Sequence, residues 1–182
     1  MTQLVGIAGQ ARSGKDTLAQ RFVLRGWQQM ACADRLKEGL AAMFSLPASV
    51  FYDDNLKDEP IVIGKMHTTP RYLMQTLGTE WGRGKLYNEV WSDLVLNDAG
   101  NMRQAGDNVV ISDLRFESEA SAVRAEGGTV IHVRRPNTKL ESDHASENGL
   151  QPMVGDKIVL NDKGLQDYLR ECDRIINAIT RQ

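Results

Sequence analysis

The sequence contains little of what several classes of protein require. Only two of its 182 residues are cysteine, and Cys32 and Cys172 are too far apart to give a metal-ligand spacing. We interpret both as small core residues rather than as a disulfide, which is typical of a reducing cytoplasm. No stretch approaches the roughly 18 apolar residues of a membrane span, and the first ten residues lack a charged-then-apolar signal pattern. These absences predict a cytoplasmic protein with no membrane partner.

An excess of positive charge is also lacking. The chain has 22 Lys and Arg against 24 Asp and Glu, a formal net charge of -2, so no basic field is available to hold a nucleic-acid polymer. The three histidines show no metal-ligand spacing. The length of 182 residues fits one domain with a substantial core. We therefore expect a single domain over residues 1–182 that acts on small molecules.

Short apolar runs that are typical of buried strands alternate with segments of helical periodicity. The expected strands cover residues 4–8, 27–33, 108–112, 129–133 and 157–160, and the expected helices cover residues 15–25, 36–44, 71–78, 87–96, 119–125 and 165–179. This alternation predicts an α/β protein of three layers, with a mostly parallel five-stranded sheet flanked by helices. Residues 45–68 look irregular and begin a substrate-side insertion that we expect over about residues 45–100.

The pattern Gly9-x-x-x-x-Gly14-Lys15 lies directly after the first expected strand and opens a helix. The glycines permit a backbone path in which successive N–H groups surround a phosphate, and the helix N-terminus adds partial positive charge. Lys15 would then bridge the β- and γ-phosphates. The alternative is a glycine-rich turn with an incidental lysine. The strand and helix on either side favour a phosphate-binding loop for ATP and a P-loop NTPase fold.

Asp16 stands where such loops usually carry the Ser or Thr that binds Mg²⁺. A carboxylate is a good ligand for Mg²⁺, so Asp16 is a candidate metal ligand, directly or through water. Thr17 is the second candidate, and alternatively contacts the α-phosphate. Asp16 could also be a carboxylate that only suits the first turn of a helix.

Asp113 follows the expected strand 108–112, at the edge of a parallel sheet where ligands bind. It could hold Mg²⁺ through water, accept a hydrogen bond from the phosphoryl acceptor, or cap the next helix. Arg115 comes two residues later, and arginine binds phosphate oxygens with two parallel donors. Trp81 and Trp91 could stack on a base, although tryptophans in helices are more often part of the core. We interpret His132 and Arg124 as structural.

Several segments together resemble the phage-type deoxynucleoside monophosphate kinases. They are Gly9-x-Ala11-Arg12-Ser13-Gly14-Lys15-Asp16-Thr17, Arg71-x-Leu73-Met74-Gln75-x-Leu77-Gly78-Thr79, Asp113-x-Arg115 with Glu119-Ala120 and Gly128-Thr129-Val130-Ile131-His132-Val133-x-Arg135-Pro136, and His144-x-x-Glu147-x-Gly149-Leu150 with Asn161-Asp162. They occur in the family's order between residue 4 and about residue 170. We find no match in residues 45–66.

The resemblance implies a kinase that uses Mg²⁺ and ATP to phosphorylate a deoxynucleoside 5′-monophosphate, and it implies a homodimer and a phage or prophage origin. For ATP and its metal it implies Gly9, Arg12, Ser13, Gly14, Lys15, Asp16, Thr17, Arg134 and Asn161. For the acceptor it implies Gln10, Lys37, Arg71, Trp91, Asp113 and Arg115, with Gln10 where the family often has lysine. Catalysis would depend on Lys15, Asp16, Asp113 and Arg115, and residues 134–150 would form a lid.

Two other functions remain open. The chain could phosphorylate another small phosphorylated molecule, as dephospho-coenzyme A kinases and phosphomevalonate kinases do. It could also be a nucleotide-binding module without turnover. The combination of Lys15, Asp16, Asp113 and Arg115 favours an enzyme, because a module that only binds nucleotide needs fewer groups on the acceptor side.

Overall fold

The computed structural model describes residues 2–136 and 150–181. The chain divides into two compact units, one formed by Met1–Cys32 with Val95–Gln182 and the other by Ala33–Leu94. The second unit begins earlier in the chain than the insertion expected at about residues 45–100. Whether residues 1–182 act as a single domain stays a prediction. None of the helices in the described residues is long and apolar enough to cross a membrane.

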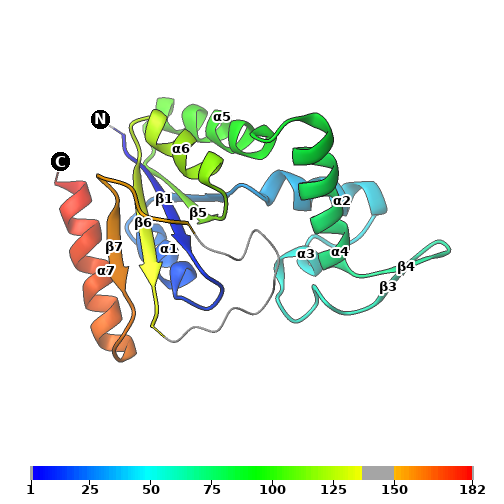
Figure 1. The fold of residues 1–182 in the computed structure, drawn as a ribbon, viewed down its shortest axis with the longest axis horizontal. Coiled ribbons are helices and arrows are strands. Elements are labelled where there is room, and N and C mark those ends of the chain that lie inside the picture. The colour runs from blue at the N-terminus through cyan, green and yellow to red at the C-terminus, as the bar shows by residue number, and fades with distance from the viewer. Residues whose placement is uncertain (1, 137–149, 182) are drawn as a thin grey trace. The chain divides into compact units, whose positions relative to one another are not determined.

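The first unit contains a sheet of five parallel strands in the order β2-β5-β1-β6-β7 (Figure 1). The strands are β1 (Leu4–Gly9), β2 (Gln28–Ala31), β5 (Val109–Leu114), β6 (Thr129–Arg134) and β7 (Lys157–Leu160). The non-consecutive order requires crossover connections, which the helices supply. The predicted five-stranded parallel sheet is confirmed, and β1, which leads into the glycine-rich loop, lies at its centre.

Helices cover both faces of this sheet, because alternate strand residues point to opposite sides. On one face the strands pack against α1 (Lys15–Val23) and α7 (Leu165–Thr180). That core comprises Val5, Ile7, Leu18, Ala19, Phe22, Trp27, Val110, Ile131, Val133, Val159, Tyr168, Cys172, Ile175, Ile176 and Ile179. On the other face, a Cβ at Gly6 would lie 3.3 Å from Val123 of α6 (Glu117–Ala125), so this helix packs closely on β1. Both cysteines are buried and free, as predicted.

The second unit is mostly helical and carries a small hairpin. Its elements are α2 (Asp34–Phe44), α3 (Ser49–Tyr52), β3 (Ile61–Ile63), β4 (Met66–Thr68), α4 (Pro70–Gln75) and the π-helix η1 (Thr76–Leu86). The prediction that residues 45–68 are irregular was wrong, because they contain α3 and the antiparallel β3–β4 pair. The strands of that pair are only three residues long and are half-buried or exposed, so they leave almost no hydrophobic periodicity in the sequence.

The helix expected over residues 71–78 continues as a π-helix to Leu86. Gly78, Gly82 and Gly84 lie within it, and such residues normally indicate a helix end. At Gly82 the reason for glycine is contact, since a Cβ there would lie 2.7 Å from the indole of Trp91. Trp91 belongs to α5 (Val90–Gln104), which is longer than the predicted segment 87–96 and runs from the second unit into the first.

Candidate functional site

The glycine-rich loop joins the end of β1 to the start of α1. Arg12 and Gly14 both have positive φ, 59° and 106°, and Ser13 N–H donates to Gln10 O, so the backbone turns sharply here. Ser13 is 1% exposed and its hydroxyl has no hydrogen-bond partner among the described residues. A buried hydroxyl without a partner is costly unless a ligand satisfies it. This loop therefore has an internal polar group suited to an anionic ligand.

The N-terminus of α1 faces the same loop. The helix begins at Lys15, and its N-cap, Gly14, makes no side-chain capping bond, so the first-turn N–H groups are not capped by that residue. N–H groups and the helix dipole together favour an anion at such a position. Lys15 is only 7% exposed although it is charged, which is unusual for lysine without a partner.

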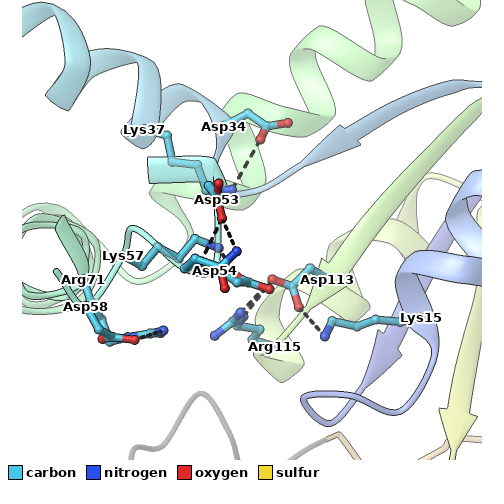
Figure 2. Close-up of polar contacts among 11 residues, drawn as sticks. Lys15, Asp34, Lys37, Asp53, Asp54, Lys57, Asp58, Arg71, Asp113 and Arg115 are labelled. Atoms are coloured by element: carbon cyan, nitrogen blue, oxygen red, sulfur yellow. Dashed lines mark hydrogen bonds and ion pairs between the residues drawn. The ribbon is translucent and has the colours of Figure 1, made fainter. Parts of the chain in front are cut away.

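The partner of Lys15 is Asp113, and Figure 2 shows Asp113 between Lys15 and Arg115. Lys15 Nζ lies 3.4 Å from Asp113 Oδ1. Arg115 donates to the other oxygen, Asp113 Oδ2, from Nε at 2.9 Å and lies 2.8 Å from it through Nη2. Three predicted catalytic residues thus form one chain of ion pairs, with two cations placed on either side of one carboxylate.

Asp113 was predicted to lie just past the end of the strand. In the structure it lies inside β5. The pairing of β1 with β5 runs from Gly6↔Ile111 to Ala8↔Leu114, so β5 has an extra residue at this point. Such a bulge redirects a side chain, and Asp113 itself has φ 66°. Aspartate tolerates this left-handed conformation better than most residues do. The bulge presents the carboxylate to Lys15 without ending the strand.

Glu119 supports this arrangement and was not identified as a site residue from the sequence. It is 3% exposed, and its Oε2 accepts hydrogen bonds from Arg115 N at 2.7 Å and Phe116 N at 3.1 Å. The side chain therefore fixes the backbone that carries Arg115. A glutamate three residues into a helix is a known capping signal, which could have indicated this role.

Two side chains from the C-terminal part of the chain hold the loop. Asn161 Nδ2 donates to Ser13 O at 2.8 Å, and Tyr168 Oη donates to Gly14 O at 2.7 Å. Asn161, which the resemblance assigns to ATP, lies against the loop backbone, and its contact with ATP stays a prediction. Tyr168, in α7, was not predicted at all. Burial, with help from nearby Cys172, raises the pKa of the Tyr168 hydroxyl, so it stays a donor.

The remaining predicted ATP ligands are less enclosed. Asp16 and Arg12 are exposed and Thr17 is half-buried. No group of three or more His, Cys, Asp or Glu side chains able to hold a metal occurs within residues 2–136 and 150–181. A metal at Asp16 would therefore depend on the nucleotide for most of its ligands, which suits Mg²⁺.

Arg134 is the last residue of β6 and Arg135 follows it, and both are exposed. They line a hollow of about 390 Å³ beside the loop, together with Gly9, Gln10, Ser13, His132, Val133, Pro136, Leu150, Gln151 and Leu160. Arg135 Nη1 lies 3.4 Å from Arg12 O. The hollow and its arginines are suited to a polar, anionic ligand. The predicted lid (residues 134–150) and the segment His144–Gly149 fall mostly or wholly in residues 137–149, outside the described residues.

In the second unit, Lys37 lies over the ring of Tyr52, with Nζ 4.2 Å from the ring centroid. Lys37 Nζ is also 3.9 Å from Asp34 Oδ1, and the Tyr52 hydroxyl donates to the same oxygen at 3.2 Å. Burial and the Asp34 carboxylate raise the pKa of Tyr52 to about 12. Tyr52 therefore remains neutral and fixes the position of the Lys37 ammonium group.

Arg71 makes a bidentate ion pair with Asp58 in the same unit (Figure 2). The two bonds, Nε to Oδ1 and Nη2 to Oδ2, are 2.6 and 3.0 Å long. The Arg71 guanidinium holds the pKa of the Asp58 carboxyl below its usual value. Because the Asp58 and Arg71 side chains are 64% and 43% exposed, water screens this pair. A carboxylate here uses the same planar donors that a phosphate would use.

Trp91 is 9% exposed and donates its indole N–H to Gly78 O at 2.8 Å. The side chain thus packs the π-helix, as the core interpretation expected, and its predicted contact with the acceptor base stays a prediction. Trp81 differs, since it is 47% exposed and is not a core residue. Sequence spacing could not separate the two tryptophans.

His132 and Arg124 belong to a buried polar network around Asp156. Both contact Asp156 Oδ2, at 2.8 Å in each case, and Met153 N donates to the same carboxylate. Burial alone would raise the pKa of Asp156, but the hydrogen bonds from Arg124, Met153 and His132 lower it well below the usual value. The network ties α6 and β6 to the segment before β7, which confirms the structural interpretation of Arg124 and His132.

Residues 49–171 match the model of a protein family described as deoxynucleotide monophosphate kinase. The match begins inside residues 45–66, where we found no likeness by inspection. A protein of Acanthamoeba polyphaga mimivirus, provisionally named a deoxynucleotide monophosphate kinase, is 30% identical over 182 residues, covering 91% of each chain. The deoxynucleotide monophosphate kinase of Enterobacteria phage T4 is 37% identical over 110 residues, 60% of this chain and 46% of that enzyme.

Among solved structures, a dephospho-CoA kinase from Campylobacter jejuni superposes with a TM-score of 0.57 and 15% identity, covering all of this chain and 98% of that one. At this identity the likeness concerns the fold alone. That protein therefore shares the arrangement seen here, a parallel sheet flanked by helices with a glycine-rich loop after its central strand.

Proposed function

The chain belongs to the deoxynucleotide monophosphate kinase family, and we propose that it transfers the γ-phosphoryl group of ATP to a deoxynucleoside 5′-monophosphate. The names of its relatives in mimivirus and in phages support this substrate class. The observation that carries the proposal in the structure is the ion-paired chain of Lys15, Asp113 and Arg115 at the end of the phosphate-binding loop.

The loop would hold the donor nucleotide. The buried Ser13 hydroxyl, the uncapped start of α1 and the Lys15 ammonium group together present donors and positive charge to the β- and γ-phosphates. The ion pair with Asp113 already fixes Lys15 at the loop. Electrostatic stabilisation that needs no rearrangement is the usual main contribution to catalysis.

Phosphoryl transfer asks little covalent chemistry of the protein. The acceptor's phosphate oxygen attacks the γ-phosphorus in line, the bond from that phosphorus to the β,γ-bridging oxygen breaks, and ADP leaves. No general base is required, since the acceptor phosphate is already largely ionised at neutral pH. Arg115 would neutralise the crowded phosphates, and Asp113 would hold both cations in place. Mg²⁺, with Asp16 and Thr17 as candidate protein ligands, would supply further neutralisation of charge.

The acceptor nucleotide would be held by cations of the second unit. Lys37 is positioned by Tyr52 and Asp34, and Arg71 presents a planar fork that Asp58 occupies. A phosphate competes well for such a fork because it carries more charge than a carboxylate. In this mechanism the acceptor phosphate displaces Asp58 from Arg71.

The cellular setting follows from weaker observations. Two free, buried cysteines suit a reducing cytoplasm, which we propose as the location. A homodimer is a further proposal that comes from the family resemblance alone. Light scattering of the purified protein would test it.

The direct test is ADP formation from Mg-ATP with dTMP, dGMP, dCMP, dAMP or dUMP as acceptor. We expect turnover with one or more of them, lost in Lys15→Ala and Arg115→Ala. Arg170→Ala is the matched control, because Arg170 is 76% exposed and pairs with Asp167 at the surface of α7. If ATP binds and none of the five raises ADP formation above background, the assigned acceptor class is wrong. Dephospho-coenzyme A is then the next acceptor to test, because this chain is similar in fold to a dephospho-CoA kinase.

A further inference from the structure

Two consecutive carbonyl groups of the phosphate-binding loop are held by side chains from a distant part of the chain. Ser13 O accepts from Asn161 Nδ2 at 2.8 Å, and Gly14 O accepts from Tyr168 Oη at 2.7 Å. The donors lie 148 and 154 residues further along the chain. Gly14 O also accepts the first helical bond, from Leu18 N at 3.1 Å. The loop backbone is therefore restrained on the side that carries these oxygens.

A carbonyl fixed in this way also fixes a donor. The peptide unit is planar and trans, so its C=O and the following N–H point in opposite directions. Ser13 C=O shares its plane with Gly14 N–H, and Gly14 C=O shares its plane with Lys15 N–H. Holding the two oxygens toward β7 and α7 therefore aims these two N–H groups the other way. Both N–H groups then point away from Asn161 and Tyr168, as donors to a phosphate require.

Both side chains lie in close contact with the loop. A Cβ at Gly14 would lie 2.8 Å from Asn161 Nδ2 and 3.0 Å from Tyr168 Oη, so the two side chains touch the loop directly. Tyr168 is 2% exposed and is a member of the main hydrophobic core. The backbone of Asn161 is itself held, since its backbone N–H donates to Arg134 O at 2.8 Å. Tyr168 is thus fixed by the core, and Asn161 is held through its backbone.

We propose that Asn161 and Tyr168 are positioning residues that aim the Gly14 and Lys15 N–H groups at the polyphosphate of the donor nucleotide. This proposal rests on the donor site of the proposed function. It gives Asn161 a different role from a contact with the adenine or ribose of ATP. The two roles differ in what they require of the ligand, because a positioning residue acts on any polyphosphate, with or without a nucleoside.

Binding of Mg-ATP and of inorganic tripolyphosphate, measured by titration calorimetry, separates these roles. We expect Asn161→Ala and Tyr168→Phe each to weaken both ligands by the same factor, about fivefold to tenfold, which is the usual effect of losing one hydrogen bond. The KM of the acceptor should remain unchanged. The controls are Asn177→Ala, on the exposed side of α7, and Tyr72→Phe, on an exposed side chain of α4.

The proposal is overturned if Asn161→Ala weakens ATP and leaves tripolyphosphate unchanged, because Asn161 would then act on the nucleoside. It is equally overturned if neither variant weakens tripolyphosphate, or if the acceptor KM rises as much as that of ATP. Should Asn161→Ala melt below the assay temperature, Tyr168→Phe decides the matter, since it keeps the ring in the core. A wild-type protein that binds neither ligand would contradict the donor site of the proposed function instead.

Discussion

The two sets of phosphate-binding candidates in this chain are held in different ways. Around the loop of the first unit, Ser13, Lys15 and Tyr168 are each less than 10% exposed, and the restraints come from the core. In the second unit, Arg71 and Asp58 form an exposed ion pair. The first arrangement is set before any ligand arrives, whereas the second offers a group that a ligand can replace. Under the proposed function, the donor site is therefore rigid and the acceptor site is adjustable.

Electrostatics explains why the two arrangements suit different tasks. A charge near the protein interior interacts several times more strongly with its neighbours than an exposed one does. Exposed ion pairs contribute about 0–1 kcal/mol and exchange readily. Catalysis needs the strong, fixed interactions at the phosphate that is transferred, and acceptor binding needs contacts that can be made and released in each turnover. Changes at Lys15, Asp113, Asp58 and Arg71 test this comparison, and Asp156→Asn tests a network that belongs to neither set.

Lys15→Ala tests the buried set of residues around the loop and should have the largest effect on kcat/KM. It removes the fixed ammonium group and leaves the Asp113 carboxylate beside the loop, so we expect kcat/KM to fall by roughly 100- to 1000-fold. Steady-state ADP formation measures this. Lys15→Arg keeps the charge with a different shape and should recover only part of the activity. Near-normal activity of the alanine variant would remove Lys15 from the catalytic group.

Asp113→Asn tests the carboxylate without disturbing its backbone. Asparagine tolerates the φ of 66° at this bulge, so the fold should remain, while Lys15 and Arg115 lose their shared anion. We expect kcat to fall by about 10- to 100-fold with little change in melting temperature. Asp113→Ala adds backbone strain and should also lower the free energy of unfolding by about 1 kcal/mol. Equal activity of Asp113→Asn and wild type would contradict this role.

Asp58→Asn tests the exposed side of the comparison. Because a neutral amide cannot form an ion pair with Arg71, the acceptor should bind more easily, and we expect its KM to fall by about two- to threefold. Arg71→Ala should raise the same KM by about tenfold, with kcat much less affected. Asp167→Asn is the control, since Asp167 forms a comparable exposed pair with Arg170. A rise of the KM in Asp58→Asn would mean that Asp58 aids acceptor binding.

Asp156→Asn should change activity least, because Asp156 is not among the residues that line the hollow beside the loop. The pKa of Asp156 is lowered in the folded state, so its charge stabilises the fold above the unfolded value of 3.8. That contribution disappears as the pH falls through the lower folded value. We expect Asp156→Asn to lower the free energy of unfolding by about 1–3 kcal/mol at pH 7.

The melting temperatures of wild type and Asp156→Asn, compared between pH 7 and pH 3, check this expectation. The difference between the two melting temperatures should be smaller at pH 3 than at pH 7. A gap that stays constant with pH would mean that the carboxylate's charge contributes nothing. Unchanged affinity for Mg-ATP is expected throughout, because the network contributes to the stability of the fold.

The parts of the fold that the sequence predicted are those with strong local patterns. β7 was predicted at residues 157–160, as observed, and the loop at residues 9–15 lies between a strand and a helix as expected. Residues 45–68 were missed because β3 and β4 are three residues long and mostly face water. No periodicity forms in so short a segment, so the hairpin left no signal.

The site was predictable to the extent that each residue acts near its own motif. Lys15, Asp113 and Arg115 were predicted from the glycine-rich loop and from the end of an apolar run. The structure brings the three side chains together. The role of Tyr168 could not be predicted from the sequence. Tyr168 is one of several apolar positions on α7, and its partner is a backbone oxygen 154 residues earlier. The backbone conformation of Asp113 could not be predicted either, since a bulge depends on the pairing with the neighbouring strand.

The distance along the chain between the loop and its supports has a consequence for biosynthesis. Residues 9–15 are made first, but β1 is central and needs β5 and β6 on both sides, and its loop needs Asn161 and Tyr168. At about 5–20 residues per second, the nascent chain spends many seconds with the loop translated and its supports not yet made. Nucleotide cannot stabilise the chain during this interval. Tight binding of nucleotide by a ribosome-bound chain would therefore report that residue 168 has emerged.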